Sequence, residues 1–182
     1  MVAAIGWRCI GHKRAYILAK HLYLIALGSN RRHAQLGSPR KIVAKAIELI
    51  DGSFGKVKAA SPVIESRPLG PSRRRYANAA IVLKSKLGPR KMLDCLMAME
   101  AMLGRERRGQ RWGARVIDLD IVLWSGGIFA KPGLLVPHPR FRERGFVLGP
   151  AAQIVSKWRD PLTGLTLAQL HARLTRPRPV PR

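Results

Sequence analysis

The sequence has 182 residues, with 34 Lys and Arg against 10 Asp and Glu, and 47% of its residues are hydrophobic. This length and apolar content favour one folded domain that buries about 70% of the surface of its unfolded chain, and they exclude a chain that is disordered throughout. The net charge of +24 attracts anions of any kind, from nucleotides to RNA and acidic membranes, so charge alone does not identify the partner.

Hydrophobic periodicity, turn residues and prolines divide the chain into strands and helices. The predicted elements are a strand at 23–27, a helix at 39–50, a strand at 54–65, a loop at 68–75, a strand at 76–87, a helix at 89–103, a loop at 105–115, a strand at 116–124, an extended segment at 136–140 and helices near 142–155 and 165–174. Pro137 and Pro139 are the reason to expect an extended chain at 136–140.

Strand, helix, strand, strand, helix, strand is the order of a ferredoxin-like α+β fold, an antiparallel sheet flanked by helices. A C-terminal helical region follows this core. We predict a single domain over residues 21–174, a basic N-terminal extension over 1–20 and a Pro/Arg-rich tail over 175–182.

The cysteines, the apolar runs and the first residues bear on location. Cys9 and Cys95 are far apart and form no C-x-x-C motif, which excludes a zinc–cysteine site and favours a reducing, cytoplasmic location. The longest apolar run, 22–27, is far shorter than the roughly 20 residues of a membrane span. Residues 1–20 lack the apolar centre of a secretory signal, so we predict a disordered extension, with an amphipathic transit peptide as the alternative.

Asp118 and Asp120 stand two residues apart in a predicted strand, so their side chains project from the same face. The carboxylates are then about 7 Å apart and repel each other by roughly 2 kcal/mol at an effective dielectric constant near 20. A divalent cation removes that repulsion, and Mg²⁺ binds one or two carboxylates and completes its shell with water and phosphate oxygens. Pairing of both aspartates with nearby arginines is the alternative.

Cationic residues cluster on both sides of this pair. The loop upstream carries Arg105, Arg107, Arg108, Arg111 and Arg115. Guanidinium groups bind phosphate in bidentate fashion, so we predict a mobile lid that closes on a polyphosphate, with a solvated charge run as the alternative. Downstream, His138 and Arg144 form a second phosphate-facing corner. The sequence has no G-x-x-x-x-G-K-[ST] and no G-x-G-x-x-G, which excludes a P-loop or protein-kinase cradle.

Several motifs now stand in a fixed order along the chain. They are Gly28-Ser29-Asn30, Ser66-Arg67-Pro68-Leu69-Gly70, Tyr76-Ala77-Asn78, Glu100, Gly104-Arg105, Arg111-Trp112-Gly113, Asp118-Leu119-Asp120, Val136-Pro137-His138-Pro139-Arg140 and Arg144-Gly145-Phe146. Over residues 22–155 this order and spacing resemble the 6-hydroxymethyl-7,8-dihydropterin pyrophosphokinases of folate biosynthesis.

The resemblance implies transfer of the pyrophosphoryl group of ATP to the hydroxymethyl oxygen of the pterin, with release of AMP. It implies a cytoplasmic monomer that binds ATP, the pterin and two Mg²⁺ ions, with no specific nucleic acid or membrane partner. By residue matching, the catalytic positions are Arg105, Arg115 and the two metal ligands Asp118 and Asp120; ATP contacts are Glu100, Arg107, Arg111, Trp112, Ile121, His138 and Arg144; pterin contacts are Ser66, Pro68, Leu69, Tyr76, Asn78, Trp112 and Phe146.

Two other functions stay open. A basic ferredoxin-like sheet also serves RNA recognition, but such a module carries aromatic residues on its central strands, where this sequence has Ala, Ile, Val and Leu. An inactive relative that keeps the fold as a binding partner is the second alternative, and the intact Asp118 and Asp120 pair argues against it.

Overall fold

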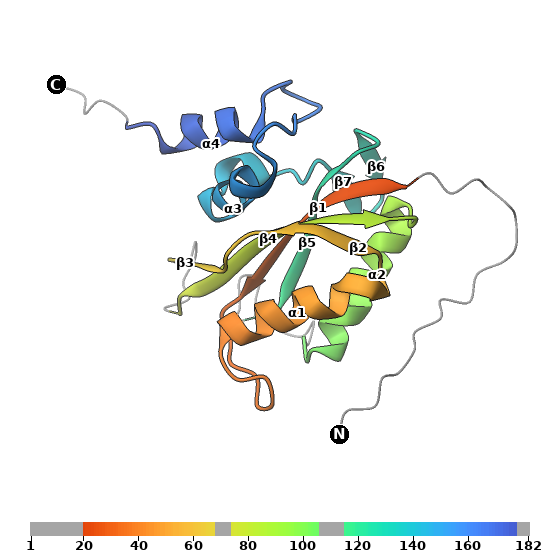
Figure 1. Ribbon diagram of the computed structural model, residues 1–182, viewed down its shortest axis with the longest axis vertical. Coiled ribbons are helices and arrows are strands. Elements are labelled where there is room, and N and C mark those ends of the chain that lie inside the picture. The colour runs from red at the N-terminus through yellow and green to blue at the C-terminus, as the bar shows by residue number, and fades with distance from the viewer. Residues whose placement is uncertain (1–19, 68–73, 106–114, 178–182) are drawn as a thin grey trace, which may run out of the picture.

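A five-stranded antiparallel sheet forms the centre of the protein, whose computed structural model describes residues 20–67, 74–105 and 115–177 (Figure 1). The strands are β1 (His21–Ser29), β2 (Lys56–Ala60), β3 (Ile64–Ser66), β4 (Tyr76–Ser85) and β5 (Asp118–Trp124). Their spatial order is β2-β4-β1-β5, and β3 pairs with β4 as well. This arrangement confirms the predicted α+β fold with a ferredoxin-like order of elements.

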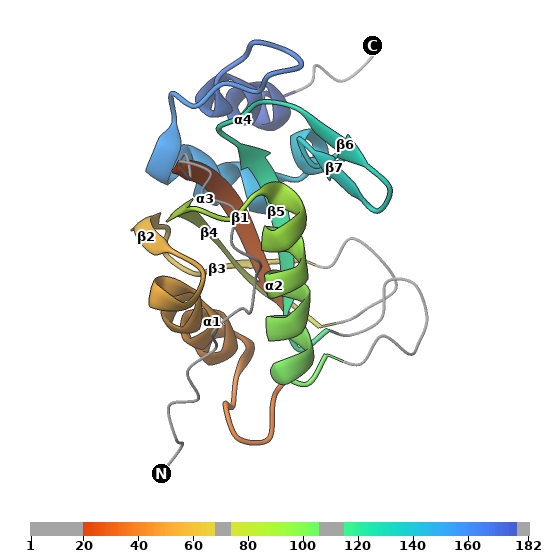
Figure 2. The same ribbon diagram turned by 90° about the vertical axis from the view of Figure 1, so that its right-hand side faces the viewer.

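Two helices cover the first face of the sheet, α1 (Pro39–Ser53) and α2 (Pro89–Met102) (Figure 2). Helix α1 forms because its apolar residues recur every three or four positions, and Ile42, Ala46 and Ile50 are fully buried against the sheet. From the sheet, Tyr23 is also fully buried, and its hydroxyl donates a hydrogen bond to Leu87 O at 2.5 Å. This cluster fixes the positions of β1, β4 and β5 relative to one another.

The second face of the sheet packs against the C-terminal helices (Figure 1). These are the 3₁₀ helix η1 (Phe141–Glu143) and the α-helices α3 (Gly145–Val155) and α4 (Leu167–Thr175). Phe141 and Leu148 are buried with Leu24 of β1 in this second cluster. Helix α4 begins at a capping box, in which the Thr166 and Gln169 side chains each bind the other's backbone N–H.

The single strand predicted over 54–65 is in fact two short strands, β2 and β3, both paired with β4. The break lies at Pro62, which has no backbone N–H for the ladder. Just before it, Ser61 forms two hydrogen bonds with Ala80. The backbone N–H of Ser61 donates to Ala80 O at 2.9 Å, and Ser61 Oγ accepts from Ala80 N at 3.0 Å. Because the ladder is interrupted at Pro62, β3 pairs separately from β2, with the start of β4.

A small hairpin, β6 (Phe129–Lys131) and β7 (Leu134–Val136), was not predicted. Its turn is made by Pro132 and Gly133, and Gly133 has a positive φ of 77°.

The extended conformation predicted for 136–140 is wrong beyond Val136. The chain bends at Pro137, after a cis Val136–Pro137 peptide bond, because His138 N–H donates to Val122 O at 3.0 Å and docks the segment on the outer edge of β5. The helix predicted from about residue 142 begins at Gly145, because Arg144 has an extended backbone (φ −111°, ψ 97°) and separates η1 from α3.

Within residues 20–67, 74–105 and 115–177, no helix combines the length and apolar character needed to cross a membrane. Cys95 is a buried free thiol in α2, whereas Cys9 lies outside the described residues. The predicted N-terminal extension and C-terminal tail also lie outside them, except for Lys20 and residues 175–177.

Candidate active site

The floor of the candidate site is the second face of the sheet, near the end of β1. Asp118 and Asp120 are partly exposed, and they alternate along β5 with Leu119 and Ile121, which are buried in the cluster on the first face. The two aspartates therefore share the opposite face, as the two-residue spacing predicts.

Small residues of β1 separate β5 from β4 at this point. Gly28 pairs with Asp118 on one side and with Asn78 on the other. A Cβ at Gly28 would lie 3.4 Å from Asn78 Oδ1, and glycine leaves that space open. Ala26 pairs with Asp120 in the same way. The sheet thus presents two carboxylates and one carboxamide across a shallow floor.

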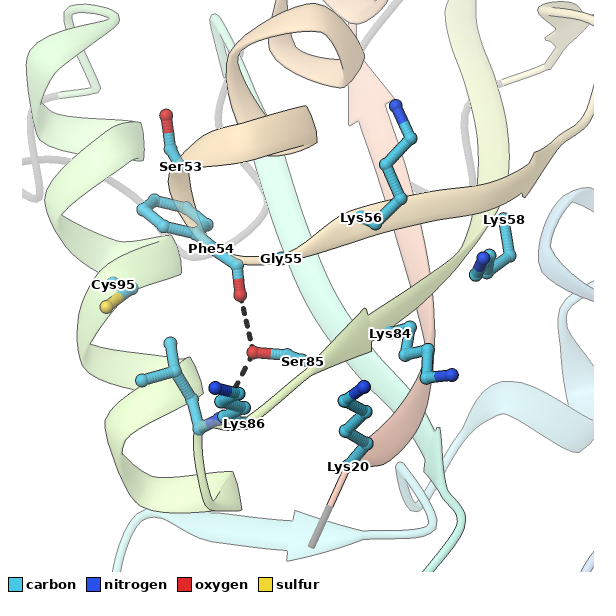
Figure 3. A pocket seen from close by; sticks show the side chains of 11 residues that line it. Lys20, Ser53, Phe54, Gly55, Lys56, Lys58, Lys84, Ser85, Lys86 and Cys95 are labelled. Atoms are coloured by element: carbon cyan, nitrogen blue, oxygen red, sulfur yellow. Dashed lines mark hydrogen bonds between the residues drawn. The ribbon is translucent and has the colours of Figure 1, made fainter. Parts of the chain in front are cut away.

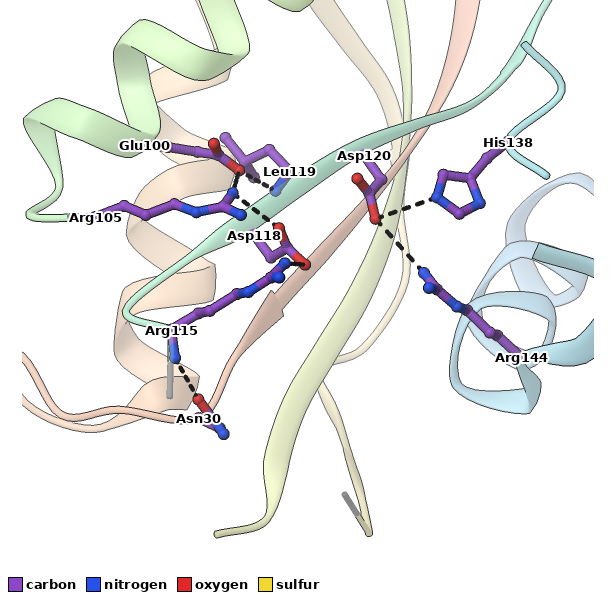
Figure 4. A network of polar contacts seen from close by, with 9 residues as sticks. All are labelled: Asn30, Glu100, Arg105, Arg115, Asp118, Leu119, Asp120, His138 and Arg144. Carbon is purple, nitrogen blue, oxygen red and sulfur yellow. Dashed lines mark hydrogen bonds and ion pairs between the residues drawn. The ribbon is translucent and has the colours of Figure 1, made fainter. Parts of the chain in front are cut away.

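Two arginines hold Asp118 (Figure 4). Arg105 Nη1 lies 2.8 Å from Asp118 Oδ1, and Arg115 Nη1 lies 2.7 Å from Asp118 Oδ2. Asn30 fixes the backbone of Arg115, since Asn30 Oδ1 accepts from Arg115 N at 2.7 Å and Asn30 N donates to Arg115 O at 3.1 Å. The alternative interpretation, in which nearby arginines pair with the aspartates, is therefore correct for Asp118 in this structure. Sequence reasoning missed the role of Asn30, because it depends on a contact across 85 positions of the chain.

Glu100 of α2 joins the first of these arginines to the sheet (Figure 4). Its side chain is buried, forms an ion pair with Arg105 and accepts a hydrogen bond from Leu119 N at 2.8 Å. Burial raises the pKa of Glu100 to about 7, despite the hydrogen bond from Leu119 and the charge of Arg105. Glu100 thus aligns Arg105 with the edge of β5.

Asp120 faces a looser pair of nitrogen groups, His138 Nε2 at 3.8 Å and Arg144 Nη1 at 3.7 Å (Figure 4). Burial and the neighbouring Asp118 carboxylate raise the pKa of Asp120 to about 6. Burial and the Arg144 charge lower the pKa of His138 to about 4, so the imidazole is neutral at pH 7 and its contact with Asp120 is not an ion pair. The only positive charge that contacts Asp120 among the described residues is therefore that of Arg144, in an ion pair longer than a hydrogen bond.

The predicted pterin contacts that the structure describes lie next to this floor. One face of the β3–β4 pair carries Ser66, Tyr76 and Asn78. Ser66 pairs directly with Tyr76, and Asn78 pairs with Ile64, which lies two residues before Ser66 and therefore on the same face. Asn78 is buried, and its Nδ2 donates to Ser66 Oγ at 2.9 Å. This strand pair places a fixed amide and a hydroxyl beside Asp118.

The other predicted positions lie in α3, in the buried cluster on the first face, or outside the described residues. Phe146 is the second residue of α3, and the Arg144 guanidinium carbon lies 5.9 Å from the centre of its ring. Ile121 is only 3% exposed and packs in the cluster on the first face, away from the aspartates. The remaining predicted contacts, Pro68, Leu69, Arg107, Arg111 and Trp112, lie outside the described residues.

The donor set decides which metal this site suits. Among the residues that the structure describes, no group of three or more His, Cys, Asp or Glu side chains gathers as a metal cage. Two aspartates on one strand, with the pKa of Asp120 raised by burial and by the neighbouring Asp118 carboxylate, instead match a hard cation that takes its other ligands from water and phosphate. The residues therefore fit Mg²⁺.

Comparisons with known proteins point the same way. Residues 24–156 match the family model described as 7,8-dihydro-6-hydroxymethylpterin-pyrophosphokinase (HPPK). The 2-amino-4-hydroxy-6-hydroxymethyldihydropteridine pyrophosphokinase of Pseudomonas aeruginosa is 37% identical over 139 residues, which cover 75% of this chain and 82% of that protein. The protein of the same name from Synechocystis is 36% identical over 115 residues, which cover 63% of this chain and 58% of that protein.

Solved structures share the fold. The crystal structure of Plasmodium falciparum HPPK-DHPS with pteroate matches with a TM-score of 0.67 at 15% sequence identity, covering 85% of this chain. The chain corresponds to 42% of the length of that protein.

Proposed function

The chain belongs to the 7,8-dihydro-6-hydroxymethylpterin-pyrophosphokinase family, whose members act in folate biosynthesis with ATP as co-substrate, and from this premise we propose how its site performs the transfer. The hydroxymethyl oxygen of the pterin attacks the β-phosphorus of ATP. The bond from that phosphorus to the oxygen shared with the α-phosphate breaks, so AMP leaves, the pterin gains the diphosphate and the hydroxyl proton passes to solvent.

One observation carries this proposal: two carboxylates and four nitrogen-bearing side chains converge at one end of the sheet. The six residues are Asp118, Asp120, Arg105, Arg115, His138 and Arg144. Transfer of a phosphoryl-type group needs positioning and charge neutralisation rather than a covalent intermediate. A site of carboxylates and guanidinium groups with no activated nucleophile suits that requirement.

Asp118 and Asp120 would hold Mg²⁺, with two ions expected. When bound, Mg²⁺ neutralises phosphate oxygens and orients the polyphosphate. The two aspartates would supply hard oxygen ligands from a rigid strand. The pairing of β5 with β1 keeps both carboxylates on one face of the sheet. The pairing of Asp118 with Arg105 and Arg115 gives that carboxylate a counter-charge in the ligand-free protein.

Arg105 and Arg115 would stabilise the negative charge that develops on the transferred group. Both guanidinium groups lie within 3 Å of Asp118, so a short movement brings them from the carboxylate to a phosphate beside it. Glu100 and Asn30 are positioning residues, since they hold Arg105 and the backbone of Arg115.

Arg144 and His138 would bind the phosphates of ATP from the opposite side. Arg144 is free to leave Asp120 because their closest contact is 3.7 Å, longer than a hydrogen bond. His138 is neutral at pH 7 because burial lowers its pKa to about 4, and a neutral imidazole can donate one hydrogen bond to a phosphate oxygen. Arg107, Arg111 and Trp112 complete the proposed ATP contacts, whereas the side chain of Ile121 is buried on the opposite face of the sheet and is not among them.

The pterin would lie over the β3–β4 pair. Asn78 offers both a donor and an acceptor to a pterin edge, and its hydrogen bond to Ser66 fixes the orientation of the amide. Tyr76, Pro68 and Leu69 line the pocket in this proposal, while Phe146 and Trp112 cover the flat ring. We also propose that the enzyme is a cytoplasmic monomer formed by residues 21–174, in keeping with the free thiol of Cys95.

Substitution of each metal ligand tests the site. Asp118→Asn and Asp120→Asn should each abolish Mg²⁺-dependent formation of AMP and weaken binding of Mn²⁺ in the presence of α,β-methylene-ATP, measured by electron paramagnetic resonance. Asp94→Asn is the matched control, because Asp94 is an exposed carboxylate of α2 outside the site. Full activity and unchanged Mn²⁺ binding in either site variant would show that the metal lies elsewhere.

A further inference from the structure

A cavity of about 540 Å³ opens where β1 begins and β4 ends (Figure 3). Lys20, at this opening, precedes Gly28 of the catalytic floor by eight positions of extended chain, which is about 26 Å. The cavity is therefore separate from the described part of the proposed catalytic site, and none of the described residues assigned to ATP, pterin or metal lines it.

Lysine is the charged residue of this cavity. Among the residues that the structure describes, five lysines line it and no arginine does. They are Lys20, Lys56, Lys58, Lys84 and Lys86, and Figure 3 shows them around the ends of the strands. Because the chain has 23 arginines and 11 lysines, a described lining that holds five lysines and no arginine differs from the composition of the chain.

The sheet register sets these charges against one another. Lys56 and Lys84 are direct partners on β2 and β4, and like charges that face each other across two strands destabilise a sheet. Within the described part of the chain, only Lys56 of the five forms an ion pair with a carboxylate, Asp51 at 2.7 Å. Four lysines of the lining thus have no carboxylate partner among the described residues, and an anion bound there would offset their repulsion.

The chemistry of the lining indicates which anion. Arginine forks recognise a single phosphate by paired hydrogen bonds, whereas lysines act as point charges that follow a line of phosphates. The phosphates of a bilayer lie in a plane, but these lysines surround a concave cavity that a flexible chain can enter. Phe54, partly buried against the core, lines the same cavity, and an aromatic side chain can stack with a base.

We propose that this lysine cavity binds the phosphate backbone of single-stranded nucleic acid without regard to sequence. Each phosphate that a lysine neutralises contributes a slope of about −0.7 to a plot of log affinity against log salt concentration. The four lysines without a carboxylate partner therefore contribute a slope of about −2.8 in total. The binding is electrostatic and leaves the pyrophosphokinase site unaltered.

The test compares two variants of equal net charge. Lys84→Gln/Lys86→Gln removes two charges from the cavity, whereas Lys41→Gln/Lys157→Gln removes two exposed charges outside it. Fluorescence anisotropy of a labelled single-stranded RNA oligonucleotide, measured over a range of salt concentrations, gives the slope for each protein. The slope of the cavity variant should be smaller in magnitude than that of the wild type by about 1.4, while the control should keep the wild-type slope.

Three results would overturn the proposal. Equal loss of slope in both variants would mean that only net charge matters. Displacement of the RNA by tripolyphosphate at equal phosphate concentration would indicate a small-anion site. Sedimentation with phosphatidylserine vesicles without RNA binding would indicate a membrane surface. Pterin-dependent AMP formation by the cavity variant should equal that of the wild type, which shows that the variant is folded.

Discussion

Replacement of Arg142 by methionine removes the only guanidinium that pairs with Asp160 in the described structure. Asp160 is fully buried, and Arg142 of η1 binds it in bidentate fashion, with Nε 2.8 Å from Oδ2 and Nη2 2.6 Å from Oδ1. Methionine keeps most of the apolar stem but leaves the carboxylate without a counter-charge. Loss of one partner of a buried ion pair costs about 3–5 kcal/mol of unfolding free energy.

The pH dependence of this loss identifies its cause. Burial raises the pKa of Asp160, but hydrogen bonds from Arg142, Thr163 and the backbone of Leu162 outweigh it and bring the pKa below the ordinary value of 3.8. A depressed carboxyl pKa stabilises the fold above 3.8, and this stabilisation is lost as pH falls through the folded-state pKa. Without Arg142, burial raises the pKa of Asp160 in the variant, so the deficit should be largest at neutral pH and should shrink as the pH falls through that raised pKa toward the depressed pKa of the wild type.

Urea unfolding at neutral pH and below pH 3.8 measures both effects. Lys45→Met is the matched control, since Lys45 pairs with Glu48 on an exposed helix surface, where such a pair contributes about 0.3–0.5 kcal/mol. The double variant Arg142→Met/Asp160→Asn removes both charges and should recover most of the loss. A deficit no larger than that of the control, or one independent of pH, would refute the reasoning.

Three further predictions concern the site and the core. Arg105→Ala and Arg115→Ala should each lower kcat by about 10²–10³-fold with an unchanged circular dichroism spectrum, and full turnover in both would remove these guanidinium groups from the mechanism. Asn78→Ala should raise the KM for the pterin more than the KM for ATP, and equal changes in steady-state assays would mean that the amide does not contact the pterin. Tyr23→Phe leaves Leu87 O without its hydrogen bond, so urea unfolding should show a loss of about 1–2 kcal/mol, whereas no loss would mean that water replaces the hydroxyl.

The main elements of the fold follow from local patterns in the sequence. Apolar periodicity and the first-turn prolines predict α1 and α2, and both helices begin at those prolines, Pro39 and Pro89. The prediction of one strand over 54–65 is too long, because Pro62 interrupts the ladder and divides this segment into β2 and β3. The β6–β7 hairpin had a signal in Pro132-Gly133, but its three-residue strands are too short for periodicity to identify.

The candidate site was predictable where its residues are close in sequence. The spacing of Asp118 and Asp120 indicates a shared face because a strand alternates, and the structure confirms it. The approach of Arg144 to Asp120 and the clamp of Asn30 on Arg115 depend on tertiary contacts between distant segments. No local pattern contains that information, so only the folded chain, or the family resemblance, brings these residues together.

Arg142 and Asp160 illustrate the same limit in the stability of the fold. An arginine and an aspartate 18 positions apart are unremarkable in a sequence with 23 arginines. Their importance comes from the burial of Asp160, which lies in the segment that joins α3 to α4 and pairs there with Arg142 of η1, and the sequence alone does not reveal it. Burial turns an ordinary pair of charges into one on which the C-terminal region depends.

The most direct test of the central claim is the fate of the ATP phosphates. The purified protein is incubated with Mg²⁺, 6-hydroxymethyl-7,8-dihydropterin and ATP that carries a radioactive β-phosphate, and the products are separated. Pyrophosphoryl transfer predicts unlabelled AMP and a labelled pterin diphosphate in equal amounts. Labelled ADP, or no product that depends on the pterin, would contradict the account.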